Sequence, residues 1–131
     1  MSIPGSFEIK VIDKTIVIKA FGLWELDTVK RWEQQCRLIA QEIDSNPWGS
    51  LSDLSDFTMA TSEAWDYMAN IGFLGKQFNK RYEAIVCKPG IEMELLKYVR
   101  ADKKNVEKAF FQYLEDAESW LIRKGVYGST A

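Results

Sequence analysis

The chain has 131 residues, of which 47% are hydrophobic, and its 17 basic and 19 acidic side chains give a net charge of −2. These values predict a single domain over residues 1–131 with enough apolar residues for a core. The near-neutral charge gives no reason to expect binding to nucleic acid or to an anionic membrane. The sequence has no histidine, which excludes mechanisms that need an imidazole base, proton shuttle or metal ligand.

The N-terminal segment lacks the basic and apolar regions of a secretory signal peptide, and no apolar run approaches the length of a membrane span. We therefore expect a cytoplasmic protein that is not transmembrane. Cys36 lies in a helical pattern and Cys87 in a strand pattern. Two cysteines would allow a disulfide, but two reduced, buried thiols fit a cytosolic protein better.

Two short runs of alternating apolar residues follow, 7–11 and 16–20, and the polar pair Asp13-Lys14 lies between them. This spacing predicts a β-hairpin with a two-residue turn. Gly22 is expected to end the second strand. The first strand, as half of a hairpin, is expected to run antiparallel at an edge of the sheet.

Helical and strand patterns then alternate to the end of the chain. Helices are predicted over 26–44, 61–78, 91–104 and 115–125, and strands over 48–57, 82–90 and 106–114. Together with the hairpin this order predicts an α/β fold with a five-stranded mixed sheet and about four helices. The strand–helix–strand connections should be right-handed and give parallel pairs.

Particular residues are assigned within these helices. Asp27 is a candidate N-cap of the first helix, and Met93, Leu96 and Val99 are expected on the buried side of the third. In the last helix Trp120 and Leu121 should pack on the sheet near Phe110 or its neighbours. Gly125 is placed to end that helix.

Three segments carry a resemblance to a known family: GLWELDTVKRWEQQ, LSDLSDFTMATSEAWDYM and VEKAFFQYLEDAESWL. With the order of elements, they resemble the SpoIIAA-like family, which is related to STAS domains. The resemblance implies strand–helix units wound in one sense, a mixed sheet and helices packed mainly on one face. It also implies a regulatory module rather than an enzyme. The wider fold neighbourhood includes lipid-carrying domains related to Sec14, which favours an apolar ligand as an alternative.

In anti-sigma-factor antagonists of this kind, a serine at the start of the second helix, inside an Asp-Ser-Ser-Gly turn, is phosphorylated. Thr61, Ser62, Glu63 and Ala64 occupy the corresponding positions in this chain. The resemblance therefore implies Ser62 as the candidate phosphorylation site, in a turn where the other three residues differ from the motif.

A candidate binding surface is predicted at the carboxyl ends of the parallel strands, where ligands of α/β proteins usually bind. Trp24 is expected in the loop after the second strand, and Phe57 and Met59 in the next strand-to-helix loop. These apolar side chains either cover the core or contact a partner. The candidate ligand- or partner-binding residues are Trp24, Ser55, Asp56, Phe57, Met59 and Thr61.

The hydroxyl and carboxylate groups in this region are expected to form turns and cap helices, since no activating base accompanies them. The sequence therefore predicts no catalytic residue, no metal site and no cofactor. The leading function is a non-enzymatic regulatory or protein-interaction domain whose partner is another protein or, as a homodimer, a second copy. The alternative is a carrier or sensor of a small apolar or lipid-like ligand, and an unrecognised enzyme is third.

Overall fold

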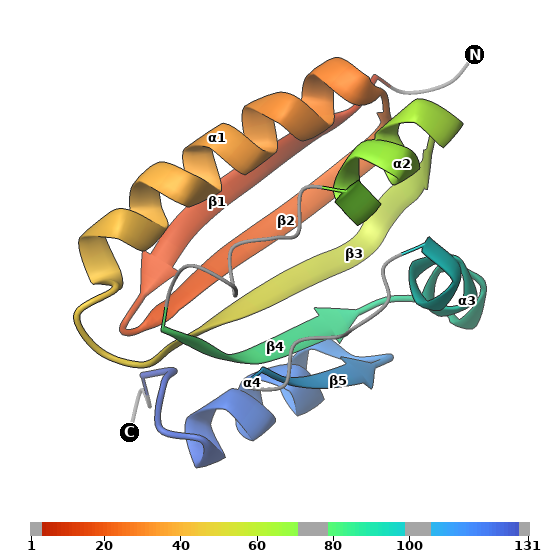
Figure 1. The fold of residues 1–131 in the computed structure, drawn as a ribbon. Helices are drawn as coiled ribbons and strands as arrows, with labels where there is room; N and C mark the ends of the chain where they lie inside the picture. Colours follow the sequence, from red (N-terminus) through yellow and green to blue (C-terminus); the bar gives the residue numbers. More distant parts are fainter. Residues whose placement is uncertain (1–3, 71–78, 99–105, 129–131) are drawn as a thin grey trace.

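The computed structural model describes residues 4–70, 79–98 and 106–128, and Figure 1 shows their arrangement. Along the chain the elements are β1 Ser6–Ile12, β2 Thr15–Trp24, α1 Leu26–Ile43, β3 Trp48–Ala60, α2 Ser62–Asn70, β4 Lys80–Val86, α3 Pro89–Tyr98, β5 Glu107–Phe111 and α4 Leu114–Arg123. Within these residues, the predicted order of strands and helices is confirmed.

The strands form a single five-stranded sheet in the order β1-β2-β3-β4-β5. β1 pairs antiparallel with β2 at the edge, and β2, β3, β4 and β5 pair in parallel. The β1–β2 turn consists of Asp13 and Lys14, and Asp13 adopts a positive φ of 55°, a conformation that aspartate tolerates in tight turns. The predicted mixed sheet with a hairpin at its edge is therefore confirmed.

Helices α1, α2 and α3 cover one face of the sheet, and α4 covers the other (Figure 1). Each crossover that contains α1, α2 or α3 moves to the next strand in the same direction, so right-handed connections place all three helices on one side. Helix α4 follows the last strand, and its Ala117 and Leu121 pack on the opposite face against Leu51 and Ala84. The helices thus lie mainly on one face, as the resemblance implied.

Strands β2 and β3 are longer than the sequence predicts. Gly22 does not end β2: with a φ of 69° it lies within the strand, next to an irregularity in the pairing with β3. Glycine permits this backbone conformation without the steric cost that other residues incur. Trp24, Phe57 and Met59 consequently lie in strands, and the prediction that they lie in loops is wrong.

Three predictions about helix ends and faces are also wrong. Glu25 holds the N-cap position of α1, while Asp27 lies in the first turn and forms an ion pair with Arg31 at 3.2 Å. On α3, Met93 is 72% exposed and Leu96 is 55% exposed. The inner side of α3 is instead formed by Ile91 and Leu95, which pack against the core. Val99 and the predicted second half of the second helix, 71–78, lie outside the described residues.

The predictions for the last strand and the last helix are confirmed in part. Trp120 contacts Phe111, the neighbour of Phe110, with ring centroids 5.8 Å apart, and Leu121 is fully buried. Gly125, with a φ of 82°, follows the C-cap of α4 and ends the helix as predicted. The last strand is shorter than predicted and stops at Phe111.

A cavity beneath the helices as the candidate binding site

An apolar cavity lies between the sheet and the helices of its α1 face. Its volume is about 140 Å³. Side chains from the four parallel strands and from α1, α2 and α3 line it. The described lining consists of Ile16, Ile18, Ala20, Trp24, Trp32, Cys36, Trp48, Ser50, Ser52, Leu54, Phe57, Trp65, Met68, Lys80, Glu83, Ile85, Leu95, Val106 and Lys108.

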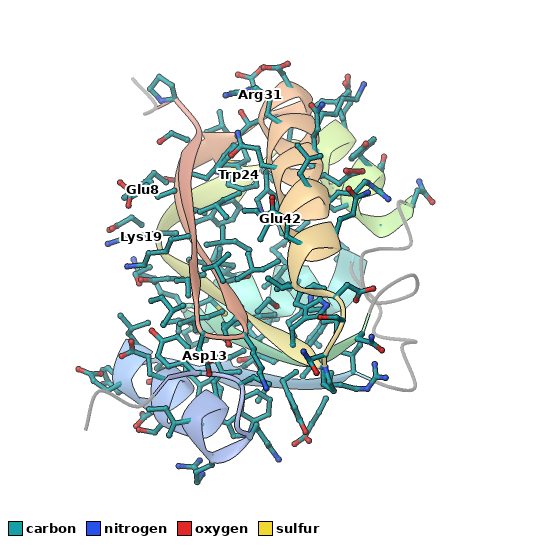
Figure 2. All side chains as sticks on the ribbon, turned by 90° about the vertical axis from the view of Figure 1, so that its left-hand side faces the viewer. Glu8, Asp13, Lys19, Trp24, Arg31 and Glu42 are labelled. Carbon is teal, nitrogen blue, oxygen red and sulfur yellow. The ribbon has the colours of Figure 1, made fainter. Side chains whose placement is uncertain are left out.

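Aromatic rings form the apolar end of this cavity. The Trp24 ring contacts Phe57 edge-on, with centroids 6.0 Å apart, and Phe57 contacts Trp65 in the same way at 6.3 Å. The Trp24 indole N–H donates to the backbone carbonyls of Ser6 and Phe21, at 3.2 Å each. With Trp24 only 4% exposed, its ring lies between β2 and α1 (Figure 2), where it packs in the core and lines the cavity.

Polar side chains form a row across the floor of the cavity. Ser50 of β3 pairs in register with Glu83 of β4, which pairs with Lys108 of β5. Laterally paired residues of parallel strands project from the same face of a sheet. The three side chains therefore point together toward the α1 side, where all three line the cavity.

The charged members of this row are joined by ion pairs. The Glu83 carboxylate lies 2.5 Å from the Lys80 Nζ and 3.4 Å from the Lys108 Nζ. Lys80 is among the buried residues, and its Nζ lies 5.9 Å from the centre of the Trp48 ring. A buried ammonium group is costly unless it is paired, so the ion pair with Glu83 is what allows Lys80 to lie at an apolar wall.

The Ser50 hydroxyl differs from the other polar groups of the row. Ser50 is 5% exposed, and its Oγ has no hydrogen-bond partner among the described residues. Buried polar groups in native proteins are nearly always satisfied, and each exception needs a reason. The Ser50 hydroxyl can therefore donate a hydrogen bond to a water molecule or a ligand in the cavity.

The sequence-predicted binding residues do not form one site. Trp24 and Phe57 line the cavity together. Ser55 and Asp56 are exposed on β3: the Ser55 hydroxyl and backbone N–H both donate to Asp53, and Asp56 forms an ion pair with Lys19 at 3.6 Å. Both residues thus have local hydrogen-bond or ion-pair partners on the surface of β3.

Thr61 and Ser62 lie at the start of α2. The Thr61 Oγ1 accepts a hydrogen bond from the Ala64 backbone N–H at 3.2 Å and so caps the helix. Ser62 is the first residue of α2 and is exposed. A more open and more polar depression of about 340 Å³, lined by Glu25, Leu26, Asp27, Thr61, Ser62 and Glu63, joins the two strand-to-helix connections. Three of these residues, Glu25, Asp27 and Glu63, are acidic.

Both cysteines are free and buried. Burial raises the pKa of the Cys36 thiol to about 12 and that of Cys87 to about 11. Thiols with such values are almost fully protonated at neutral pH and are poor nucleophiles. Cys36 therefore forms part of the cavity wall as an apolar side chain.

These pKa values predict a loss of stability in alkaline solution. Above pH 9 the unfolded chain loses the thiol proton, whereas the folded chain retains it up to about pH 12, so the free energy of unfolding falls across this window. One such group contributes a slope of at most about 1.4 kcal/mol per pH unit. Urea unfolding at pH 8, 9 and 10 should show this fall, and Cys36→Ala should reduce it. An equal slope in Cys36→Ala would contradict the assignment.

No helix among the described residues is both long and apolar enough to cross a membrane. Residues 4–70, 79–98 and 106–128 likewise bring no group of three or more cysteine, aspartate or glutamate side chains together in a way that could hold a metal ion.

Sequence reasoning missed the polar row of the cavity, although one signal was present. Ser50 and Ser52 alternate with Leu51 in a strand flanked by helices. Strands covered on both faces are usually apolar throughout, so serine at alternate positions marks a polar patch on one covered face. Glu83 and Lys108 belong to other strands, and only the pairing register brings them beside Ser50.

A scan against protein-family models gives no match, and neither does a search of the curated proteins. Solved structures do match. An uncharacterized protein of the DUF3478 family from Shewanella loihica PV-4, described as having a SpoIIAA-like fold, is similar over 92% of this chain and 95% of its own, with a TM-score of 0.66 and 17% sequence identity.

A second match is an anti-sigma factor antagonist from Mycobacterium paratuberculosis, with a TM-score of 0.56 and 17% identity over 93% of this chain and 99% of that one. At this identity the similarity establishes the fold and not the activity. The chain has the SpoIIAA-like α/β fold, the architecture that is also used by an anti-sigma factor antagonist.

Proposed function

We propose that this chain is a non-enzymatic regulatory domain of the STAS-like kind, which works in the cytoplasm by binding another protein. The shared fold of the anti-sigma factor antagonist from Mycobacterium paratuberculosis supports a regulatory role. The absence of histidine from the sequence supports binding rather than catalysis.

The observation that carries this proposal is the outer face of α3. Met93 and Leu96 are three residues apart, so they lie on the same side of the helix, and both are largely exposed. A helix of a small domain normally turns such residues to the core. Neighbouring apolar side chains exposed on one helix are typical of an interaction surface. We call Met93 and Leu96 the α3 surface.

Charge substitutions on the α3 surface test this function. The immobilised domain should retain a specific protein from an extract of its own organism, and the double variant Met93→Glu/Leu96→Glu should lose that protein. A charge placed at an interface centre disrupts binding without affecting a core. Leu38→Glu is the matched control, since Leu38 is 57% exposed on α1, away from α3. Equal retention by the wild type and the double variant would contradict the proposal.

A homodimer is one form of this function. Sedimentation of the purified domain distinguishes a homodimer from a complex with a different protein. If the wild type self-associates and Met93→Glu/Leu96→Glu does not, the partner is a second copy of this chain. If the wild type is a monomer, the partner is a different protein.

Ser62 is proposed as the site at which binding is regulated by phosphorylation. It is exposed, and a negative charge at a helix N-terminus is tolerated electrostatically. We therefore expect Ser62→Asp to weaken partner binding severalfold while the melting temperature changes little. The adjacent Glu63→Gln is the control for charge in this region. Identical partner affinities of Ser62→Asp and wild type would remove Ser62 as a regulatory site.

A carrier or sensor of a small apolar ligand is the second candidate function, and the cavity favours it. Its walls are mostly aliphatic and aromatic, and the few polar groups converge on one part of the floor, which is the usual composition of a small-molecule site. Ligand binding in this cavity and protein binding on the α3 surface use different residues, so variants can test them separately.

A further inference from the structure

We propose that the cavity binds a small aromatic or short-chain carboxylic acid, whose carboxylate lies at the polar row and whose apolar part contacts Trp48, Ile16 and Ile18 beside that row. This inference rests on the carrier or sensor function above and specifies its ligand class. The argument depends on the size of the cavity, the unsatisfied Ser50 hydroxyl and the two ammonium groups of Lys80 and Lys108 on the floor.

The volume limits the size of the ligand. At about 140 Å³ the cavity is close to an engineered protein cavity of roughly 150 Å³ that binds benzene. Beside the polar row the wall is formed by Trp48, Ile16 and Ile18, which pack in one cluster. A single six-membered ring or a chain of a few carbons fits this space, whereas a long acyl chain does not.

The polar row favours an anionic group on the ligand. The Ser50 hydroxyl can donate one hydrogen bond, and the ammonium groups of Lys80 and Lys108 are donors only. A carboxylate is an acceptor-only group with two oxygens, so it matches these donors. Hydrogen bonds of this charge-assisted kind are roughly twice as strong as neutral ones.

Glu83 lies in the same row and would repel an anion by itself. Its carboxylate, however, is paired with both Lys80 and Lys108. Taken together these three side chains bring two positive charges and one negative charge to the floor. An anion is therefore favoured over a cation, which the two ammonium groups would repel.

The register gives the position of the carboxylate. Ser50 is one strand away from Glu83 and two strands away from Lys108. Neighbouring strands are about 4.8 Å apart, so Ser50 and Lys108 are separated by roughly 10 Å at the backbone. The long lysine side chain, directed toward Glu83, shortens this gap. A carboxylate that accepts from the Ser50 hydroxyl thus lies on the side of Ser50 that faces Glu83 and its paired ammonium groups, with its ring directed toward Trp48 and Ile18.

Benzoate is a suitable probe, with benzyl alcohol as a neutral compound of similar size. In an NMR titration of the full chain, benzoate should shift the indole N–H signal of Trp48, which lines the cavity two residues from Ser50 on β3. The signal of Trp120, on the opposite face of the sheet, should not move. We expect benzoate to bind at least tenfold more tightly than benzyl alcohol.

Ser50→Ala distinguishes a ligand contact from a structural role. Loss of a hydrogen bond to a charged group should weaken benzoate binding by about tenfold. The melting temperature without ligand should stay the same or rise, because the hydroxyl has no partner to lose. Ser119→Ala, on the exposed side of α4, is the matched control and should change neither quantity.

Lys108→Gln should also weaken benzoate binding by about tenfold, whereas Lys10→Gln, on the exposed side of β1, should not. Equal affinities for benzoate and benzyl alcohol, or unchanged benzoate affinity in Ser50→Ala, would overturn the carboxylate assignment. The remaining function would then be a carrier of an uncharged apolar ligand. Failure of both benzoate and benzyl alcohol to shift any cavity indole would overturn both the inference and the carrier function.

Discussion

Replacement of Trp48 by alanine is expected to lower the free energy of unfolding by about 4 kcal/mol, within the range for truncation of a large buried aromatic ring. Trp48 is the first residue of β3 and is completely buried. Its ring packs in the cluster that contains Ile16, Ile18 and Cys36. Removal of the ring also extends a cavity that already exists beside it, so the neighbouring side chains cannot collapse easily into the space.

A hydrogen bond adds to this expected loss. The Trp48 indole N–H donates to the Asp44 carboxylate at 3.1 Å, and Asp44 is the C-cap of α1 and also accepts from the Asn79 backbone N–H. Trp48 thus connects the end of α1 to the start of β4. Urea unfolding followed by circular dichroism measures the loss, and Trp48→Phe should recover more than half of it. A change below about 1 kcal/mol in Trp48→Ala would contradict the packing described.

Truncation of Trp120 to alanine is expected to cost about 3 kcal/mol, the lower end of the range for core aromatics, because the ring is only partly buried. The ring contacts Tyr82 edge-on, with centroids 6.0 Å apart, and Phe111 at 5.8 Å. The Lys124 ammonium lies 5.4 Å from its centre. Trp120 therefore holds α4 against both β4 and β5.

Ile122→Ala is the matched control, since Ile122 lies on the same helix with its side chain exposed. This control should change the free energy of unfolding by less than about 0.5 kcal/mol. If Trp120→Ala shifted the melting temperature no more than Ile122→Ala does, Trp120 would be a surface contact and not a residue that anchors α4.

Periodicity and turn chemistry were sufficient to predict the sheet. The alternation of 16–20 predicts a strand whose Ile16, Ile18 and Ala20 are buried, and the two-residue Asp13-Lys14 turn predicts the hairpin. The parallel pairs follow from the strand–helix alternation, because each crossover has to be right-handed.

The length of β3 could not be predicted in the same way. Its thirteen residues include three serines and two aspartates, which have low strand propensity. Pairing with β2 on one side and β4 on the other supplies hydrogen bonds that local propensity does not reveal. The prediction that Gly22 ends the second strand failed for a related reason, since glycine occurs both at strand ends and in bulges within strands.

The candidate site was predicted only in fragments. Trp24 and Phe57 were recognised as residues that do not fit a solvated loop, and they do share one apolar environment. Their burial means that Trp24→Ala should reduce stability, as expected for side chains that cover the core. The polar row depends on the register among β3, β4 and β5, which no single segment of the sequence encodes.

The exposed face of α3 was missed because its apolar pattern permits two orientations. Met93 and Leu96 match helical spacing, and so do Ile91 and Leu95 on the other side. Since both sides are apolar, periodicity could not identify the one that packs against the core. That ambiguity is itself informative, because a helix that is apolar on both sides has one apolar side left for a partner.

Hydrogen–deuterium exchange of the domain, alone and bound to the protein that it captures, tests the proposed function most directly. The account predicts that partner binding slows exchange in α3, Pro89–Tyr98, and leaves the exposed side of α1 and the strands unchanged. Protection confined to α1, or to α4 on the opposite face of the sheet, would contradict the assignment of the α3 surface as the site of regulatory binding.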